Sequence, residues 1–217
     1  MKSSHSKRFS HFLAICGVTA PLVMLVLWII ASLLRPGYNQ VTQYGSELGT
    51  GPNGIIMNTN FFITGWLVIA FAAGLLRGVH GGRWLQLGAV LVGTFGVGEV
   101  LTGFLPCDTG CPIVAQSLSQ LAHNVDAAIA FMALALAPIL VSIGLRYYDY
   151  WKPYRAYSLI TGFVAIGLLS IFSASALGHP GFVGLLQRLF LAGPFLWIEV
   201  MATRLLGVYE LDPPQQY

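Results

Sequence analysis

Charged side chains are scarce in this sequence. Asp, Glu, Lys and Arg together make up 9% of the 217 residues, whereas hydrophobic residues make up 56%. A soluble domain carries about 25% charged residues, and so few charges could not cover the surface of a soluble fold of this size. The composition therefore excludes an ordinary soluble domain and predicts an integral membrane protein.

Alternation of the kind found in transmembrane β-strands is also missing, and six long apolar runs stand in its place. Each run reaches or approaches the roughly 20 residues that an α-helix needs to cross a bilayer. We therefore expect an all-α fold with six transmembrane helices at about 13–34, 59–76, 84–105, 121–145, 157–177 and 185–206. These helices would form one domain, 13–206, between an N-terminal tail, 1–12, and a C-terminal tail, 207–217.

The few basic residues are unevenly distributed. If the N-terminus lies inside, all of the 11 Lys and Arg residues except Arg35 and Arg188 fall on the inner side. Cytoplasmic loops of membrane proteins carry an excess of Lys and Arg. The bias predicts a plasma-membrane protein with both termini in the cytoplasm, and it explains the net charge of +3 without a nucleic-acid partner.

Cysteine is scarce too, with three residues in the chain. Cys107 and Cys111 share the loop after the third apolar run, which the predicted orientation puts outside, in an oxidising compartment. Their spacing suits a tight turn that brings two Cα atoms within the roughly 7 Å that a disulfide allows. We therefore expect a structural disulfide rather than a redox pair, since active dithiols more often have two intervening residues.

Motifs of familiar active sites are absent. The sequence contains neither an HExxH nor an HxxxH pair for zinc, and it has no GxSxG segment around a nucleophilic serine. The segment GTFGVG is spaced like a nucleotide-binding loop, but it lies within an apolar run and follows no strand. Function must therefore depend on the polar residues in and beside the apolar runs.

Ionisable residues within transmembrane helices are costly and often mark a functional or structural cluster. Topology places six ionisable residues toward the outer side, four in or at the ends of helices and two, Glu47 and Asp108, in loops: Glu47, Glu99, Asp108, His123, Asp126 and Arg188. Of these, His123 and Asp126 are three residues apart, so they share one face of the fourth helix. The residues are therefore expected to gather at one end of the bundle.

Three interpretations of this cluster remain open. In the first it is structural, and Glu99, His123, Asp126 and Arg188 pair with one another, as buried charges usually do. In the second it binds a lipid headgroup or a small polar ligand, and Arg188 offers its guanidinium to an anion. In the third it is catalytic, with His123, Asp126 and Glu99 as the candidate residues.

The catalytic interpretation has two forms. One histidine with several carboxylates could hold Zn²⁺ or Mn²⁺. Alternatively, His123 oriented by Asp126 could act as a general base, with Ser46 or Ser119 as the nucleophile. We expect no bound cofactor unless the metal-dependent form applies.

Three short motifs agree with one known family. They are SELG at Ser46–Gly49 followed by Asn58 and Asn60, FLPCD at Phe104–Asp108 after a glycine-spaced run, and His123 at the start of the fourth run. Together they resemble the prokaryotic membrane family catalogued as domain of unknown function 998, over roughly residues 10–206. The resemblance implies six helices and an external set of polar residues, and it implies no substrate. These motif positions are Ser46, Glu47, Gly49, Asn60, Pro106, Asp108 and His123.

The leading hypothesis is an integral membrane protein that binds a lipid headgroup or a small external ligand, with the lipid bilayer as its surroundings. The candidate ligand-binding residues are Ser46, Glu47, Asn60, Glu99, Asp108, His123, Asp126 and Arg188. A membrane-embedded lipid hydrolase is the second hypothesis. The third is a small transporter, which would have to work as an oligomer because six helices leave few polar residues in the inner half.

Overall fold

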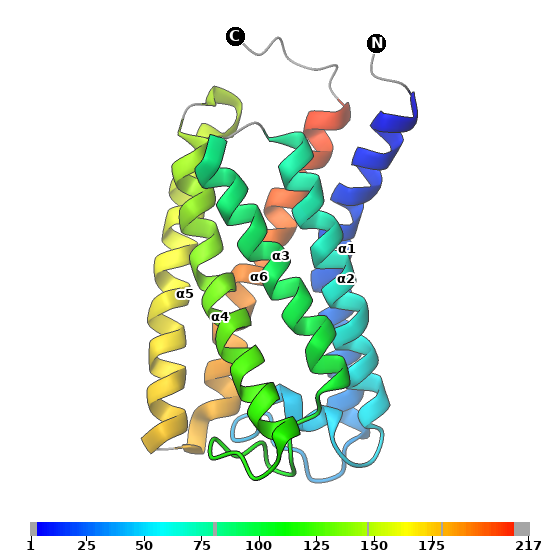
Figure 1. The fold of residues 1–217 in the computed structure, drawn as a ribbon, viewed down its shortest axis with the longest axis vertical. Helices are drawn as coiled ribbons and strands as arrows, with labels where there is room; N and C mark the ends of the chain where they lie inside the picture. The colour runs from blue at the N-terminus through cyan, green and yellow to red at the C-terminus, as the bar shows by residue number, and fades with distance from the viewer. Residues whose placement is uncertain (1–3, 80–81, 147, 179, 211–217) are drawn as a thin grey trace.

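The computed structural model describes residues 4–79, 82–146, 148–178 and 180–210. Six long α-helices follow one another along the chain (Figure 1): α1 (Ser4–Leu34), α2 (Gly54–Gly78), α3 (Gly82–Phe104), α4 (Leu118–Leu145), α5 (Lys152–Gly178) and α6 (Val183–Glu210). The described residues contain no β-strand. The prediction of an all-α fold is confirmed.

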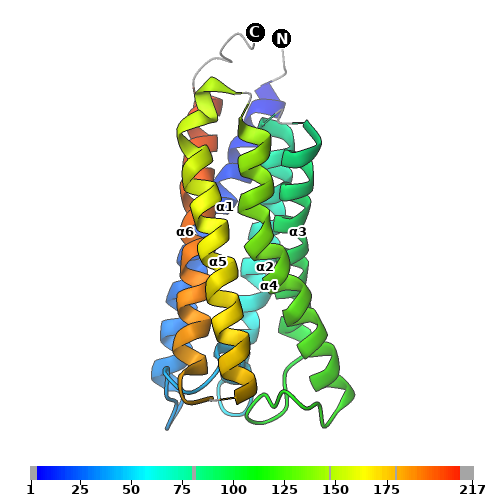
Figure 2. The ribbon, with the colours of Figure 1, turned by 90° about the vertical axis from the view of Figure 1, so that its left-hand side faces the viewer.

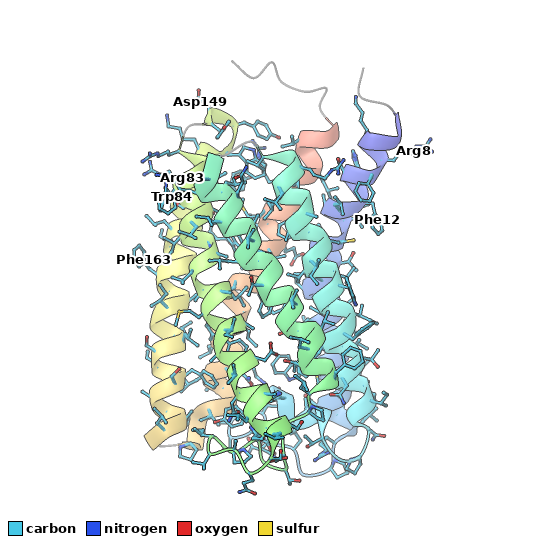
Figure 3. All side chains as sticks on the ribbon, in the orientation of Figure 1. Arg8, Phe12, Arg83, Trp84, Asp149 and Phe163 are labelled. Atoms are coloured by element: carbon cyan, nitrogen blue, oxygen red, sulfur yellow. A yellow bond between two sulfur atoms is a disulfide. The ribbon has the colours of Figure 1, made fainter. Side chains whose placement is uncertain are left out.

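All six helices are long and apolar enough to cross a membrane. The shortest, α3, has 23 residues, which corresponds to about 35 Å at 1.5 Å per residue and exceeds the roughly 30 Å of a hydrocarbon layer. Figure 3 shows Phe12 on α1 and Phe163 on α5 pointing away from the bundle, and both rings are exposed. Their surroundings suit hydrocarbon, so the chain is a multi-pass integral membrane protein.

Each helix packs against its neighbours in the sequence, and α6 also packs against α1, which closes the ring. The helices alternate in direction, so that α1 begins and α6 ends at the same end of the bundle (Figures 1 and 2). We call this the terminal end; it also carries η2 (Asp149–Trp151). The opposite, long-loop end carries η1 (Gly45–Gly49), the connection 105–117 and η3 (Pro180–Phe182).

Glycines fix α3 tightly between its neighbours. A Cβ atom at Gly65 of α2 would lie 2.5 Å from the carbonyl oxygen of Gly96 in α3, and one at Gly96 would lie 2.8 Å from that of Gly65. A Cβ at Gly88 of α3 would likewise lie 2.9 Å from the backbone nitrogen of Val141 in α4. Small residues allow such close approach between membrane helices, and the polar residues of α3 are therefore held in fixed positions.

Helix α5 is attached differently at its two ends. Near the terminal end, Ser142 of α4 donates a hydrogen bond to the carbonyl oxygen of Arg155 (3.0 Å), and Trp197 of α6 donates one to the hydroxyl of Ser158 (2.9 Å). Toward the long-loop end α4 and α5 diverge (Figure 2), and Phe172 is the one buried residue of α5 beyond Ala165. The space between these helices is where the cavity described next is found.

Candidate functional site

A cavity of about 420 Å³ lies inside the bundle near the long-loop end. Side chains from all six helices line it, together with residues of η1 and of the connection 105–117. Its volume falls within the roughly 300–1,000 Å³ of pockets that bind small molecules. The cavity is therefore the first place in the described structure to look for a binding site.

Two ionisable side chains, Glu99 of α3 and His123 of α4, line the cavity, and each is only 6% exposed. The Oε2 atom of Glu99 is buried and has no hydrogen-bond partner among the described residues. A buried polar atom left without a partner costs about 1–3 kcal/mol, and more when it is charged. Glu99 therefore has an unmet requirement for a donor.

The imidazole of His123 is oriented by the backbone. Its Nδ1 atom lies 2.9 Å from the carbonyl oxygen of Leu105. Because a carbonyl oxygen can only accept, we assign the proton to Nδ1, which leaves Nε2 with a free lone pair when the ring is neutral. His123 thus offers a second acceptor to the cavity.

Three other polar side chains of the lining are already engaged. Gln187 accepts a hydrogen bond from the backbone N–H of Gly45 (2.7 Å), and Thr102 donates one to Asp126 (2.9 Å). Asn124 donates to the carbonyl oxygen of Ile113 (2.9 Å). Two buried polar atoms of the described lining residues are left without a partner, the carboxyl Oε2 of Glu99 and the indole Nε1 of Trp28, and Glu99 is the ionisable one of the two.

Tyr44 contributes a phenol to the lining from the loop that precedes η1. Burial raises the pKa of this phenol above its usual value, and the neighbouring carboxylate of Glu47 raises it further. Tyr44 therefore remains neutral at physiological pH and brings no charge into the cavity.

The cavity is open at the side of the bundle. Its exposed lining residues include Ala128 and Met132 on α4, and Ser173 and Leu177 on α5. Met132 is 50% exposed and Leu177 is 77% exposed. These residues form the rim of a lateral opening, which we call the α4–α5 mouth, at a level that the hydrocarbon of a membrane would surround.

Several residues predicted for the site hold the long-loop end together instead. The carboxylate of Glu47 accepts hydrogen bonds from the backbone N–H of Tyr44 (3.0 Å) and the amide of Gln43 (2.8 Å), which stabilises the η1 turn. Asn60 is fully buried and donates to the carbonyl oxygen of Met24 (3.0 Å), which ties α2 to α1. Neither residue lines the cavity.

Arg188 is also engaged in the long loop. Its guanidinium donates hydrogen bonds to the carbonyl oxygens of Gln43 (3.2 Å) and Gly184 (2.7 Å) and to the hydroxyl of Tyr38 (2.5 Å). It also lies 5.0 Å from the centre of the Trp28 ring. Arg188 does not line the cavity, so its guanidinium is not placed to hold an anion there.

The remaining predicted residues lie around the cavity. Asp126 bonds to Thr102, and Asp108 accepts a hydrogen bond from Ser117 at the start of α4 (2.8 Å). Ser46 lines the cavity, with its Oγ atom 3.4 Å from the sulfur of Cys111. The structure thus brings Ser46, Glu99 and His123 together at the cavity and leaves the other predicted ligand-binding residues outside its lining.

The described residues do not assemble a recognisable catalytic centre. No three His, Cys, Asp or Glu side chains among them lie close enough together to hold a metal ion. The hydroxyl of Ser119 donates to the carbonyl oxygen of Pro106 (2.8 Å), and the hydrogen bond of His123 is made to Leu105. Neither candidate serine therefore pairs with His123 in this part of the chain.

Cys107 and Cys111 have their sulfur atoms at disulfide distance, and their Cα atoms are 5.1 Å apart. Both are buried, and Cys111 lines the cavity. Cys111 and Ser46 of η1 therefore form part of the cavity wall at the long-loop end.

Several lining residues are not among the residues predicted for the site. Gln187 could have been noticed as a polar residue near the start of an apolar run, next to Arg188. Trp28, Phe131 and Phe172 could not, because an aromatic ring that faces a cavity looks like one that faces lipid when only the sequence is read. These rings form much of the apolar wall.

The structure thus defines a six-helix integral membrane protein with an internal cavity that opens between two helices. The chain belongs to the family described as protein of unknown function (DUF998), which it matches over residues 18–204. The family predicted from the short motifs is therefore confirmed. No curated protein and no solved structure matches the chain.

Proposed function

We propose that this protein binds an amphiphile, such as a membrane lipid, by taking its polar headgroup into the cavity from the outer leaflet of the plasma membrane. The observation that carries this proposal is the combination of a buried, unpartnered carboxyl group and an apolar lateral opening in one cavity. A headgroup would lie against Glu99 and His123, and its hydrocarbon chain would leave through the α4–α5 mouth.

The lateral opening favours an amphiphile over a water-soluble ligand. A soluble ligand would enter from the aqueous side, where Ser46 of η1, Cys111 and the apolar side chain of Ile113 line the cavity. The α4–α5 mouth has apolar side chains at its rim, which favour contact with hydrocarbon over contact with water. A molecule that is already in the membrane would therefore have the more direct path.

Two features support an external position for the long-loop end. Most of the basic residues belong to the terminal end, and cytoplasmic loops are the ones enriched in Lys and Arg. Figure 3 shows Arg8 and Arg83 near that end. In addition, paired cysteines persist in oxidising compartments, which suits Cys107 and Cys111 at the opposite end.

The test is to compare the lipids that co-purify with the full chain and with a variant whose mouth is blocked. Ala176 lines the cavity, whereas Ala174, two residues earlier on α5, is exposed and does not. Ala176→Trp should remove a lipid that mass spectrometry finds with the wild-type protein, and the matched control Ala174→Trp should retain it. Equal lipid content in all three proteins, or no specific lipid in the wild type, would refute the proposal.

A further inference from the structure

The charge of the cavity indicates which amphiphile it would take. We infer that the site selects a headgroup that carries an ammonium group, and that it discriminates against anionic headgroups. This inference rests on the proposed function, because it names the ligand class of the same cavity.

The charged groups of the lining favour a cation over an anion. Glu99 and His123 are the ionisable groups at the buried end, and no Lys or Arg is found among the described lining residues. An anionic phosphate or carboxylate would lose its hydration on entry and meet a carboxyl group without a compensating cation. Burial of an unpaired charge in a region of low dielectric constant is strongly unfavourable.

A second carboxylate adds to the negative potential near Glu99. The Oδ1 atom of Asp126 would lie 3.1 Å from a Cβ atom built on Gly98, the residue that precedes Glu99 in α3. Asp126 accepts a hydrogen bond from the neutral hydroxyl of Thr102. The wall formed by α3 and α4 therefore favours positive charge.

The basic residue expected to attract an anion is committed elsewhere. The guanidinium of Arg188 donates hydrogen bonds to two backbone carbonyl groups and to Tyr38, and it lies over the ring of Trp28. Exposing it to the cavity would break these contacts. The lining thus lacks the residue type that usually recognises phosphate and carboxylate groups.

An ammonium group matches what the lining offers. It carries only donors, and the buried end presents the carboxyl oxygen of Glu99 and the Nε2 lone pair of His123 as acceptors. The cavity wall also contains the rings of Tyr44 and Phe172, and the faces of aromatic rings attract cations. One headgroup could therefore satisfy the unpartnered oxygen of Glu99 and gain from the aromatic wall.

The test uses two amphiphilic probes. Each has one photoreactive alkyl chain of the same structure, and the chain ends in a primary amine in one probe and in a carboxylate in the other. Each is added to the full chain in bilayer discs of phosphatidylcholine, and labelling is mapped by mass spectrometry. The measured quantity is labelling of the α4–α5 mouth divided by labelling at Phe163, which lies on the exposed surface of α5. This ratio corrects for the different partitioning of the two probes into the bilayer.

We expect the ratio for the amine to exceed that for the carboxylate by about tenfold or more, the factor that one charge-assisted hydrogen bond provides. Glu99→Gln, which keeps the shape of the side chain, should remove most of this difference. Should Glu99→Gln fail to fold, the comparison of the two probes on the wild-type protein decides alone.

The outcomes separate the two proposals. Mouth labelling by the carboxylate that equals or exceeds labelling by the amine would overturn the inferred headgroup and leave the binding of amphiphiles intact. If labelling by both probes is the same in the wild type as in Ala176→Trp, no amphiphile enters the cavity, and the proposed function fails with the inference.

Discussion

Replacement of Arg188 by methionine distinguishes a residue that holds a loop from one that binds a ligand. The substitution keeps an unbranched side chain and removes the guanidinium that bonds to Gln43, Gly184 and Tyr38. Hydrogen bonds to charged groups contribute about 1.5–3 kcal/mol each when intact, but Arg188 is only partly buried. We take a net loss of about 2 kcal/mol for the anchoring of the loop, which corresponds to about 30-fold in an opening equilibrium.

Hydrogen exchange measured by mass spectrometry provides the assay. Backbone amides of residues 38–47 should exchange about 30-fold faster in Arg188→Met than in the wild type, while exchange in the middle of α2 should not change. Arg188→Lys is the matched control, because lysine keeps the charge and loses the planar fork; it should give a loss of protection between those of the wild type and Arg188→Met. If protection of 38–47 is unchanged while ligand binding is lost, Arg188 is a ligand-binding residue and the structural role assigned to it is wrong.

Three further predictions concern the packing of the bundle and its paired cysteines. Gly65→Leu places a side chain against the backbone of α3 and should lower the stability of the bundle by about 1–3 kcal/mol, whereas Gly93→Ala, whose Cβ would meet its nearest neighbour at 3.6 Å, should leave thermal unfolding unchanged; equal effects would contradict the packing argument. Asn60→Leu removes a fully buried hydrogen bond between α2 and α1 and should cost about 1–3 kcal/mol, read as a lower melting temperature; an unchanged one would show that this bond contributes nothing. A membrane-impermeant maleimide should label Cys107 and Cys111 on whole cells only after reduction, and labelling before reduction, or from the cytoplasmic side alone, would refute the external disulfide.

The fold could be predicted because its signal is local. A run of about 20 apolar residues specifies a membrane-spanning helix wherever it occurs, and no knowledge of neighbouring helices is needed to recognise it. The glycines of α3 could also be interpreted in advance, since close approach in lipid requires small residues. The exact partners, such as Gly65 for Gly96, depend on how the helices rotate against one another, which the sequence does not specify.

The candidate site could be predicted only in part, because the role of a polar residue depends on its partners. Glu99 and His123 are recognisable in the sequence as ionisable residues in apolar runs, and the structure places both at the cavity. Arg188 carried the same signal, but its contacts with Tyr38 and Trp28 come from a segment about 150 positions away in the chain. The sequence does not predict which face of α5 lines the cavity. Phe172 is buried and Phe163 is exposed on the same helix, and nothing in their local sequence distinguishes them.

Glu99 is expected to lower the stability of the protein when no ligand is bound. Buried polar residues with partners, such as Asn60, stabilise the bundle, whereas Glu99 lacks a partner for one carboxyl oxygen. A binding site that is left unsatisfied without its ligand costs stability, and its removal often stabilises the protein. Glu99→Met, an apolar replacement of similar length, should therefore stabilise the ligand-free protein by about 1 kcal/mol, or about 2–4 °C in melting temperature for a chain of this size.

The test compares the melting temperatures of Glu99→Met and Asn60→Leu in the same lipid-free preparation. Both variants exchange a buried polar side chain for an apolar one, so a general benefit of hydrophobicity would raise both melting temperatures. The structure predicts opposite signs, because one substitution removes an unmet hydrogen-bonding requirement and the other removes a bond that joins two helices. If Glu99→Met lowers the melting temperature as much as Asn60→Leu does, Glu99 has a structural partner in the folded protein. The cavity then contains no unpartnered carboxyl group to attract a ligand.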